Sequence, residues 1–267
     1  MGGDRFQMSR FFVDTEAVNK ENSTITITGE DVKHIKSVLR GAVGDKLEVC
    51  DQAGTDYTAA IKGLEKDSVI AEIISSKPNT TEPPVNITLY QGLPKGDKME
   101  YIIQKCIELG VYRIVPVMTE RAVVRFSNDK DAAAKASRWQ KIAAEAAKQC
   151  DRGIIPKVET PISYKAALKL AERSDLKLIP YEEETEGSLR GSLDFFSRRF
   201  EDRSNIVKPE IALIIGPEGG FAPEEIENAL KAGFNSITLG PRILRTETAG
   251  VAVISIIMYE IGDMSPE

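Results

Sequence analysis

The sequence is poor in residues that bind metals and contains no long apolar run. Its 267 residues include one histidine, His34, and three cysteines that lie far apart. Four ligands of a zinc site cannot be assembled from this set at normal spacing, so we expect no metal. The three thiols are expected to be free and buried, as cysteines commonly are.

The lack of long apolar segments also bears on location. No run approaches the roughly 20 apolar residues that a membrane-spanning helix needs. The first ten residues, Met1 to Arg10, are polar and lack the apolar core of a signal peptide. We therefore expect a cytoplasmic protein that has no membrane partner.

The charge balance is acidic but uneven. The net charge of −6 at first argues against a nucleic-acid partner. Residues 91–152, however, carry 12 Lys and Arg against 8 Asp and Glu. Because local basic patches set the electrostatic footprint on RNA, the sequence permits such a partner without requiring one.

A polar segment rich in proline divides the chain. Residues 75–84 contain three prolines and nothing apolar to bury, and proline biases its neighbours towards extended backbone. We predict a linker at residues 77–84, between a domain of residues 1–76 and a domain of residues 85–267.

The first domain has mainly β patterns. Short, partly alternating segments at residues 46–50, 57–61 and 68–74 are separated by Gly and Asp turns, which predicts a small β-barrel. One helix is expected to begin with Thr28 as its N-cap. Its inward face would carry Val32, Ile35, Val38 and Leu39, and another face would carry Lys33, Lys36 and Arg40. Such a basic stripe is most often a solvated surface, but an RNA-binding module also needs one.

In the second domain, strand and helix patterns alternate, which predicts an α/β domain with a mostly parallel sheet. The apolar run at 211–215 is typical of a strand buried on both faces. Strands are predicted at 85–91, 111–118, 211–215 and 236–239, helices after Asp97 and at 137–149, 223–232 and 246–261, short units at 163–173 and 176–181, and a loop or peripheral helix at 183–204.

Two turns that contain glycine follow predicted strands, and ligands bind at the strand ends of open α/β sheets. The first turn, residues 216–221, has neither the Lys-Ser/Thr of a phosphate loop nor a G-x-G-x-x-G spacing. The second, residues 239–249, is apolar without periodicity and contains Arg242 and Arg245. Taken singly, each could be a plain connector.

Together, in this order and spacing, the two turns resemble the SPOUT class of methyltransferases, in particular the family that methylates N3 of a uridine in 16S ribosomal RNA. The resemblance covers nearly all of residues 9–261 and departs from the family pattern at Lys148. Further matching blocks are Ser9–Val13, His34, Val38–Arg40, Leu93–Glu100, Gln104–Lys105, Glu108–Val111, Thr119–Arg121 and Gln149–Arg152.

The resemblance implies a PUA-like barrel followed by a trefoil-knotted domain, an obligate homodimer, and S-adenosylmethionine (SAM) as cofactor. It implies a cofactor site of Leu93, Ile215, Gly216, Glu218, Gly219, Leu239, Gly240, Ile243, Leu244 and Thr248. Catalytic arginines would be Arg121, Arg152 and Arg245, which could stabilise charge on the uracil oxygens. RNA contacts would come from Arg10, His34, Lys36, Arg40 and Lys95. A general base stays unassigned, because His34 belongs to the other domain and Glu218 is as often a backbone cap.

Three alternatives remain at this point. The chain could be a SPOUT enzyme for ribose or another base, in transfer RNA or 23S RNA. It could be a non-catalytic RNA-binding factor that retains a cofactor pocket. A nicotinamide-dependent dehydrogenase is disfavoured, because the dinucleotide fingerprint is missing.

Overall fold

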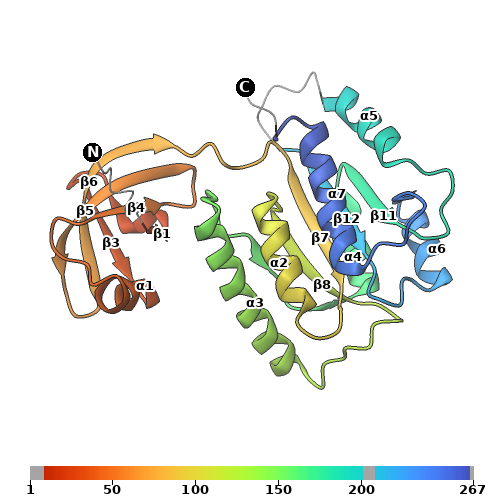
Figure 1. Ribbon diagram of the computed structural model, residues 1–267, viewed down its shortest axis with the longest axis horizontal. Helices are drawn as coiled ribbons and strands as arrows, with labels where there is room; N and C mark the ends of the chain where they lie inside the picture. Colours follow the sequence, from red (N-terminus) through yellow and green to blue (C-terminus); the bar gives the residue numbers. More distant parts are fainter. Residues whose placement is uncertain (1–8, 201–207, 265–267) are drawn as a thin grey trace. The chain divides into compact units, whose positions relative to one another are not determined.

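The computed structural model describes residues 9–200 and 208–264, and the chain divides into two compact units (Figure 1). The first unit consists of residues 1–82 and 147–155, and the second of residues 83–146 and 156–267. Residues 1–8 and 201–204, on which parts of the sequence predictions fall, lie outside the described residues. No described helix is both long and apolar enough to cross a membrane.

The first unit is built on a six-stranded sheet in the order β1-β4-β5-β6-β3-β2. All of its pairings are antiparallel except that between β1 and β4. One apolar core receives side chains from five of the six strands and from the helical segment, which explains the alternating pattern of the sequence. Its strands are β1 (Arg10–Phe12), β2 (Val18–Asn19), β3 (Thr24–Thr28), β4 (Lys46–Cys50), β5 (Thr55–Leu64) and β6 (Ser68–Pro78).

The helical segment of the first unit differs from the prediction. Thr28 ends strand β3, and Gly29, with φ +75°, is the N-cap of the short helix α1 (Glu30–Lys33). A π-helix (His34–Val38) follows directly. Its wider turn carries the next residues off the buried face: Val32 and Ile35 are buried as predicted, whereas Val38 is 66% and Leu39 41% exposed. The predictions for Thr28, Val38 and Leu39 were therefore wrong.

Residues 147–155 pack with the first unit because several groups of that unit bind them. The guanidinium of Arg10 donates hydrogen bonds of 3.2 and 3.0 Å to the carbonyl of Arg152, and a third of 2.6 Å to Asp56. The Cys50 thiol donates to the Gly153 carbonyl over 3.1 Å. Lys148 forms an ion pair of 2.8 Å with Asp31. The sequence analysis had assigned this segment to the second domain.

The second unit contains a sheet in which every pairing is parallel, as predicted. Its order is β10-β8-β7-β12-β11-β13, with β9 paired to β8. Strand β12 lies in the middle, and its residues Ile211–Ile215 are at most 3% exposed, so both of its faces are covered. The strands are β7 (Asn86–Gly92), β8 (Arg113–Met118), β9 (Lys157–Val158), β10 (Ile162–Ser163), β11 (Leu176–Pro180), β12 (Glu210–Ile215) and β13 (Asn235–Ile237).

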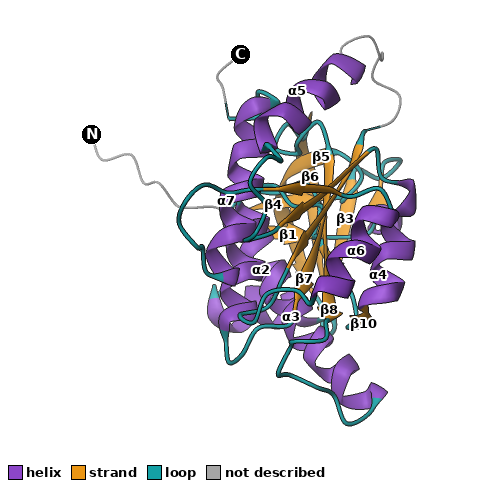
Figure 2. Ribbon diagram, turned by 90° about the vertical axis from the view of Figure 1, so that its right-hand side faces the viewer, coloured by secondary structure: helices purple, strands orange, loops and turns teal. Residues whose placement is uncertain are grey.

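Helices cover both faces of this sheet (Figure 2). Helices α4 (Tyr164–Leu170) and α6 (Pro223–Lys231) share one core with Tyr90, Val115 and Ile214 of the strands. Helices α2 (Lys98–Glu108) and α7 (Thr246–Glu260) pack against each other, and α7 also contacts β7 and β12. This arrangement brings the start of α7 to the carboxyl ends of the central strands.

Most element boundaries agree with the sequence to within a few residues, one helix start differs more, and one segment left open as a loop or peripheral helix contains a helix. Helix α3 (Asp129–Gln149) begins eight residues before the predicted start, because the Asn128 side chain accepts the Asp131 N–H over 3.0 Å and so caps it. The segment after Glu183 contains the helix α5 (Leu189–Phe200). Cys50 and Cys106 are buried as predicted, whereas Cys150 is half-buried.

Candidate functional site: a cavity at the carboxyl edge of the parallel sheet

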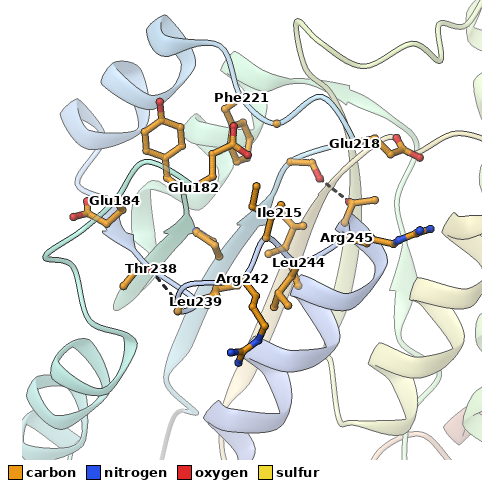
Figure 3. Close-up of a pocket in the computed structure, with 18 of the residues that line it drawn as sticks. Glu182, Glu184, Ile215, Glu218, Phe221, Thr238, Leu239, Arg242, Leu244 and Arg245 are labelled. Atoms are coloured by element: carbon orange, nitrogen blue, oxygen red, sulfur yellow. Dashed lines mark hydrogen bonds between the residues drawn. The ribbon is translucent and has the colours of Figure 1, made fainter.

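The main cavity of the second unit has a volume of about 780 Å³ and lies where β11, β12 and β13 end. Because these strands are parallel neighbours, the loops that follow them meet at one edge of the sheet. The loops are residues 180–185, 215–221 and 238–246, and the cavity also touches Lys98 and Ala249. In Figure 3, the apolar side chains of Ile215, Leu239 and Leu244 lie close together. The carboxyl groups of Glu182, Glu184 and Glu218 lie further out on the surrounding loops.

Two of these loops are joined by a hydrogen bond. The Thr246 hydroxyl, in the first turn of α7, donates to the carbonyl of Gly216 over 2.6 Å. The start of α7 itself, at Arg245, has no side-chain cap. The prediction that the Gly216 and Leu239 segments form a single cavity is confirmed.

The turn at 216–221 is tight because glycines stand where side chains would collide. A Cβ on Gly216 would lie 3.2 Å from the Phe221 ring, and one on Gly92 would lie 2.7 Å from Pro217. Gly220 has a φ of +65°, which favours glycine. The close approach of β7 and this loop thus depends on the lack of a side chain at Gly92 and at Gly216.

The loop after β11 forms the third wall, and the sequence analysis missed it. Glu184 accepts hydrogen bonds of 2.9 Å from the N–H groups of Glu186 and Gly187. These bonds, that of Gly187 first, hold the pKa of Glu184 at about 2. The signal was present, because 176–181 was predicted as a short unit, but strand order could not be derived, so the loop could not be placed beside the other two.

The charged side of the cavity centres on Glu218. Its carboxylate lies 2.8 Å from the Lys98 ammonium and accepts the N–H of Lys95. Burial alone would raise the pKa of Glu218, but the bonds from Lys98 and from backbone N–H groups outweigh it and leave the pKa below its usual value. Lys98 also lies 3.5 Å from Glu247, and its hydrogen bond to Glu218 above all raises its pKa. Both ions therefore keep their charge at neutral pH.

The structure gathers most, but not all, of the predicted cofactor residues around the cavity. Those that line it are Ile215, Gly216, Glu218, Leu239, Gly240, Ile243 and Leu244. Leu93 is buried next to Gly92, Gly219 turns its carbonyl to Arg121, and Thr248 is exposed in the first turn of α7. Lining residues that were not predicted as such include Tyr181, Glu182, Glu184, Thr185, Phe221, Thr238, Thr246 and Lys98.

The three predicted catalytic arginines have different surroundings. Arg245 lines the cavity, and its side chain is 80% exposed. Arg121 is exposed and donates to the Gly219 carbonyl over 3.2 Å, so it lies against the 216–221 loop. Arg152 belongs to the first unit, where its guanidinium, 3% exposed, donates two bonds of 2.8 Å to Glu82.

The predicted RNA-binding residues also divide into two kinds. Arg10 is buried in its bonds to Asp56 and Arg152, and the Lys36 ammonium donates to the carbonyls of Glu65 and Lys66. His34 and Arg40 are exposed, with the His34 ring packed edge-on against Phe11 at 6.1 Å between centroids. Arg40 has a φ of +54°, which is uncommon for a residue with a side chain. Lys95 is exposed too.

Metal ligands do not cluster in the part of the chain that the structure describes. Among residues 9–200 and 208–264, no group of three His, Cys, Asp or Glu side chains is placed to hold a metal ion. The groups that line the cavity are backbone groups, apolar side chains, hydroxyls, carboxylates, arginines and the Lys98 ammonium.

A parallel sheet with a loop-lined cavity of this size at its carboxyl edge defines an α/β enzyme that binds a small molecule there. Comparison with known proteins identifies the kind. Residues 81–258 match the RNA methyltransferase domain family, and residues 27–74 match the RNA methyltransferase PUA domain family. The chain belongs to the RNA methyltransferase family, and it is a methyltransferase.

Curated and solved relatives cover nearly the whole chain. The ribosomal RNA small subunit methyltransferase E of Bacillus subtilis (strain 168) is 38% identical over 255 residues, 95% of this chain and 97% of the relative. A methyltransferase E structure from Neisseria gonorrhoeae, bound to S-adenosyl methionine, aligns with a TM-score of 0.75 at 33% identity, over 94% of this chain and 97% of that one. A Legionella pneumophila structure in complex with SAM has a TM-score of 0.78 at 32% identity, with the same coverage.

Proposed function

We propose that this enzyme methylates N3 of a uridine in the 16S ribosomal RNA of the small subunit and uses SAM as the methyl donor. The observation that carries the proposal is the cavity shared by the 216–221 and 238–246 loops. The names of the relatives, which refer to ribosomal RNA of the small subunit, support the substrate. Such a substrate would be met in the cytoplasm, so we propose that location as well.

The residues at the cavity fit SAM. Ile215, Leu239 and Leu244 offer an apolar surface of the kind that packs against an adenine ring. The carboxylates of Glu182 and Glu218 are acceptors for ribose hydroxyls or for the positive groups of this cofactor. When bound there, SAM would supply an electrophilic methyl group. The chain's own part is to hold that group in line with the base and to exclude water.

Methylation at N3 also requires that the uracil N–H proton be removed. The negative charge that then develops on the uracil oxygens can be stabilised by cationic donors. Arg245 and Arg121 lie on or against the two loops of the cavity, and we propose both for this role. The contacts of Arg152 with Glu82 favour a structural role instead.

For RNA recognition we propose the exposed side chains of His34 and Arg40 in the first unit and of Lys95 in the second. The match to the RNA methyltransferase PUA domain family supports this use of the first unit. Arg10 and Lys36, which are held by partners within the chain, could contact RNA only by exchanging those bonds.

We further propose a homodimer and a trefoil knot in the second unit. Exposed apolar side chains on α7, Ile256 at 41% and Tyr259 at 66%, border a groove of about 620 Å³ and would be covered by a second copy. The knot is what the likeness to SPOUT methyltransferases implies for the 216–221 and 239–249 loops. Light scattering on the purified protein tests the dimer, and a monomeric mass would contradict it.

One experiment tests the proposed function directly. Unmodified small-subunit particles are incubated with the enzyme and SAM labelled in its methyl group, and the nucleosides of the RNA are then analysed. We expect label in 3-methyluridine from 16S RNA and none with transfer RNA or large-subunit particles. Label in a 2′-O-methyl nucleoside would contradict the base specificity, and lack of any transfer would contradict the activity.

A further inference from the structure

A glutamine lies fully buried in the apolar centre of the parallel sheet. Gln91 is the second-to-last residue of β7, between β8 and β12, and it is 0% exposed. Burial of an amide group costs free energy unless hydrogen bonds replace those made with water. A buried glutamine in a central strand such as β7 therefore calls for an explanation, which the contacts of its amide nitrogen provide.

The Gln91 amide starts a chain of hydrogen bonds that ends at the cavity. Its Nε2 donates to the carbonyl of Gly92 over 3.0 Å and to the hydroxyl of Thr246 over 2.9 Å. Since the Gly92 carbonyl can only accept, the amide nitrogen must face this side. The Thr246 hydroxyl thus accepts from Gln91 and gives its one proton to the Gly216 carbonyl, 2.6 Å away. The direction of both bonds is fixed.

The last acceptor belongs to a peptide group that can form hydrogen bonds only through its carbonyl. Because residue 217 is proline, the peptide between Gly216 and Pro217 has no N–H, so its carbonyl is its only hydrogen-bonding group. That carbonyl is bound to Thr246, and Thr246 is 6% exposed and lines the cavity. The hydrogen bond from Thr246 to Gly216 therefore joins the two loops, and Gln91 fixes the direction of this bond from within the sheet.

We propose that Gln91 is a positioning residue of the cofactor site: through Thr246 it fixes the Gly216–Pro217 peptide and so holds the two loops of the cavity at the separation that SAM requires. This inference rests on the proposed function. Gln91 does not line the cavity itself, and its effect is indirect. Loss of the chain should weaken SAM binding more than it weakens RNA binding or the fold.

The test uses variants of nearly equal size in the full-length protein. Gln91→Met and Thr246→Val each remove one donor of the chain, and Thr246→Ser restores the hydroxyl that Thr246→Val loses. Thr88→Val is the matched control. It removes a buried hydroxyl from the same strand, where Thr88 accepts from Arg113 over 3.4 Å and lies away from the cavity. SAM affinity is measured by titration calorimetry, RNA KM by methyl transfer, and folding by thermal unfolding.

We expect Gln91→Met and Thr246→Val to raise the Kd for SAM by about tenfold each, with the RNA KM unchanged. The Kd for SAM of the double variant should exceed that of either single variant by no more than about threefold, because both substitutions break the same chain of hydrogen bonds. Thr246→Ser should recover most of the affinity, and Thr88→Val should bind SAM as the wild type does. If Gln91→Met does not fold, the Thr246→Val and Thr246→Ser pair carries the same comparison.

Two results would overturn the inference alone: wild-type affinity in both Gln91→Met and Thr246→Val, or a loss in Thr88→Val as large as theirs, which would show a general effect of stability. A wild-type protein that gives no heat with SAM would overturn the proposed function and the inference with it. The two failures are therefore distinguishable in one series of titrations.

Discussion

The ammonium of Lys98 lies 2.8 Å from the carboxylate of Glu218, and this pair ties the first turn of α2 to the 216–221 loop. The Glu218 carboxylate also accepts the N–H of Lys95, so one side chain holds both ends of the segment before the helix. The side chains are 33% and 29% exposed. Water therefore screens the pair, and its role is to orient the loop more than to stabilise the fold.

Glu218→Gln should accordingly weaken SAM binding severalfold while the free energy of unfolding falls by less than about 1 kcal/mol. The lowered pKa of Glu218 gives a pH signature. A carboxylate of this kind contributes fully above its unfolded pKa, near 4.5, and its contribution is lost as pH falls through the lower folded pKa. The difference in the free energy of unfolding between wild type and Glu218→Gln, measured by urea unfolding, should therefore stay constant above pH 4.5 and shrink as the pH falls below it. Glu224→Gln, an exposed change on α6, is the control, and an equal loss there would contradict the prediction.

Glu184→Gln should destabilise the second unit in a way that depends on pH. The N–H groups of Gly187 and Glu186 hold the pKa of Glu184 at about 2, so the carboxylate stabilises the fold fully above pH 4.5. That contribution disappears as pH falls towards 2. The difference in Tm between wild type and variant should be largest near pH 7 and shrink below pH 4. Glu186→Gln, which keeps the same backbone N–H, should show no such trend, and a constant difference for Glu184→Gln would contradict this account.

Gly92→Ala should damage the cavity because the added methyl group would lie 2.7 Å from Pro217. We expect a loss of about 1–3 kcal/mol in the free energy of unfolding and weaker SAM binding, since the 216–221 loop must shift. Gly191→Ala in α5 is the matched control: its Cβ would meet Ser188 at 3.7 Å, and alanine favours helix. Urea unfolding measures both variants. Equal free energies of unfolding for Gly92→Ala and Gly191→Ala would contradict the prediction, because they would show that the 216–221 loop can shift at no cost.

Arg152→Ala should destabilise the first unit, because it removes the cationic partner of the Glu82 carboxylate, which also accepts the Gly153 N–H over 2.7 Å. Breaking a buried pair of this kind costs about 3–5 kcal/mol, and the Arg152 side chain is 3% exposed. The double variant Arg152→Met with Glu82→Gln should recover part of that loss. Activity measured per folded molecule should be retained. A folded Arg152→Ala protein that no longer transfers methyl groups would return this residue to a catalytic role.

Much of the second unit could be predicted from the sequence because its signals are local. The apolar run of β12, the glycine after α2 at Gly110 and the proline that opens α6 each mark an element by themselves. The two glycine turns also predicted one shared cavity correctly. Strand order is set by contacts between distant segments, so the third wall at Glu184 could not be placed.

The errors in the first unit have a similar origin. A π-helix inserts one residue per turn without any mark in the hydrophobic pattern, so Val38 and Leu39 were assigned to a face that they leave. The motif position that suggested a catalytic role for Arg152 likewise gave no sign of its partner Glu82, which lies 70 residues away in the chain. Such pairing becomes visible only when the fold brings the two segments together.

The segment at residues 147–155 makes the first unit discontinuous in the chain. A fragment ending at residue 82 would lack the carbonyl groups that Arg10 and Cys50 bind, and Glu82 would lose Arg152. Proteolysis at the proline-rich stretch would therefore separate the strands of the first unit from residues 147–155 of the same unit. The ribosome makes the strands of the first unit before it makes residues 147–155. The unit can therefore complete its packing only after the end of α3 has been synthesised.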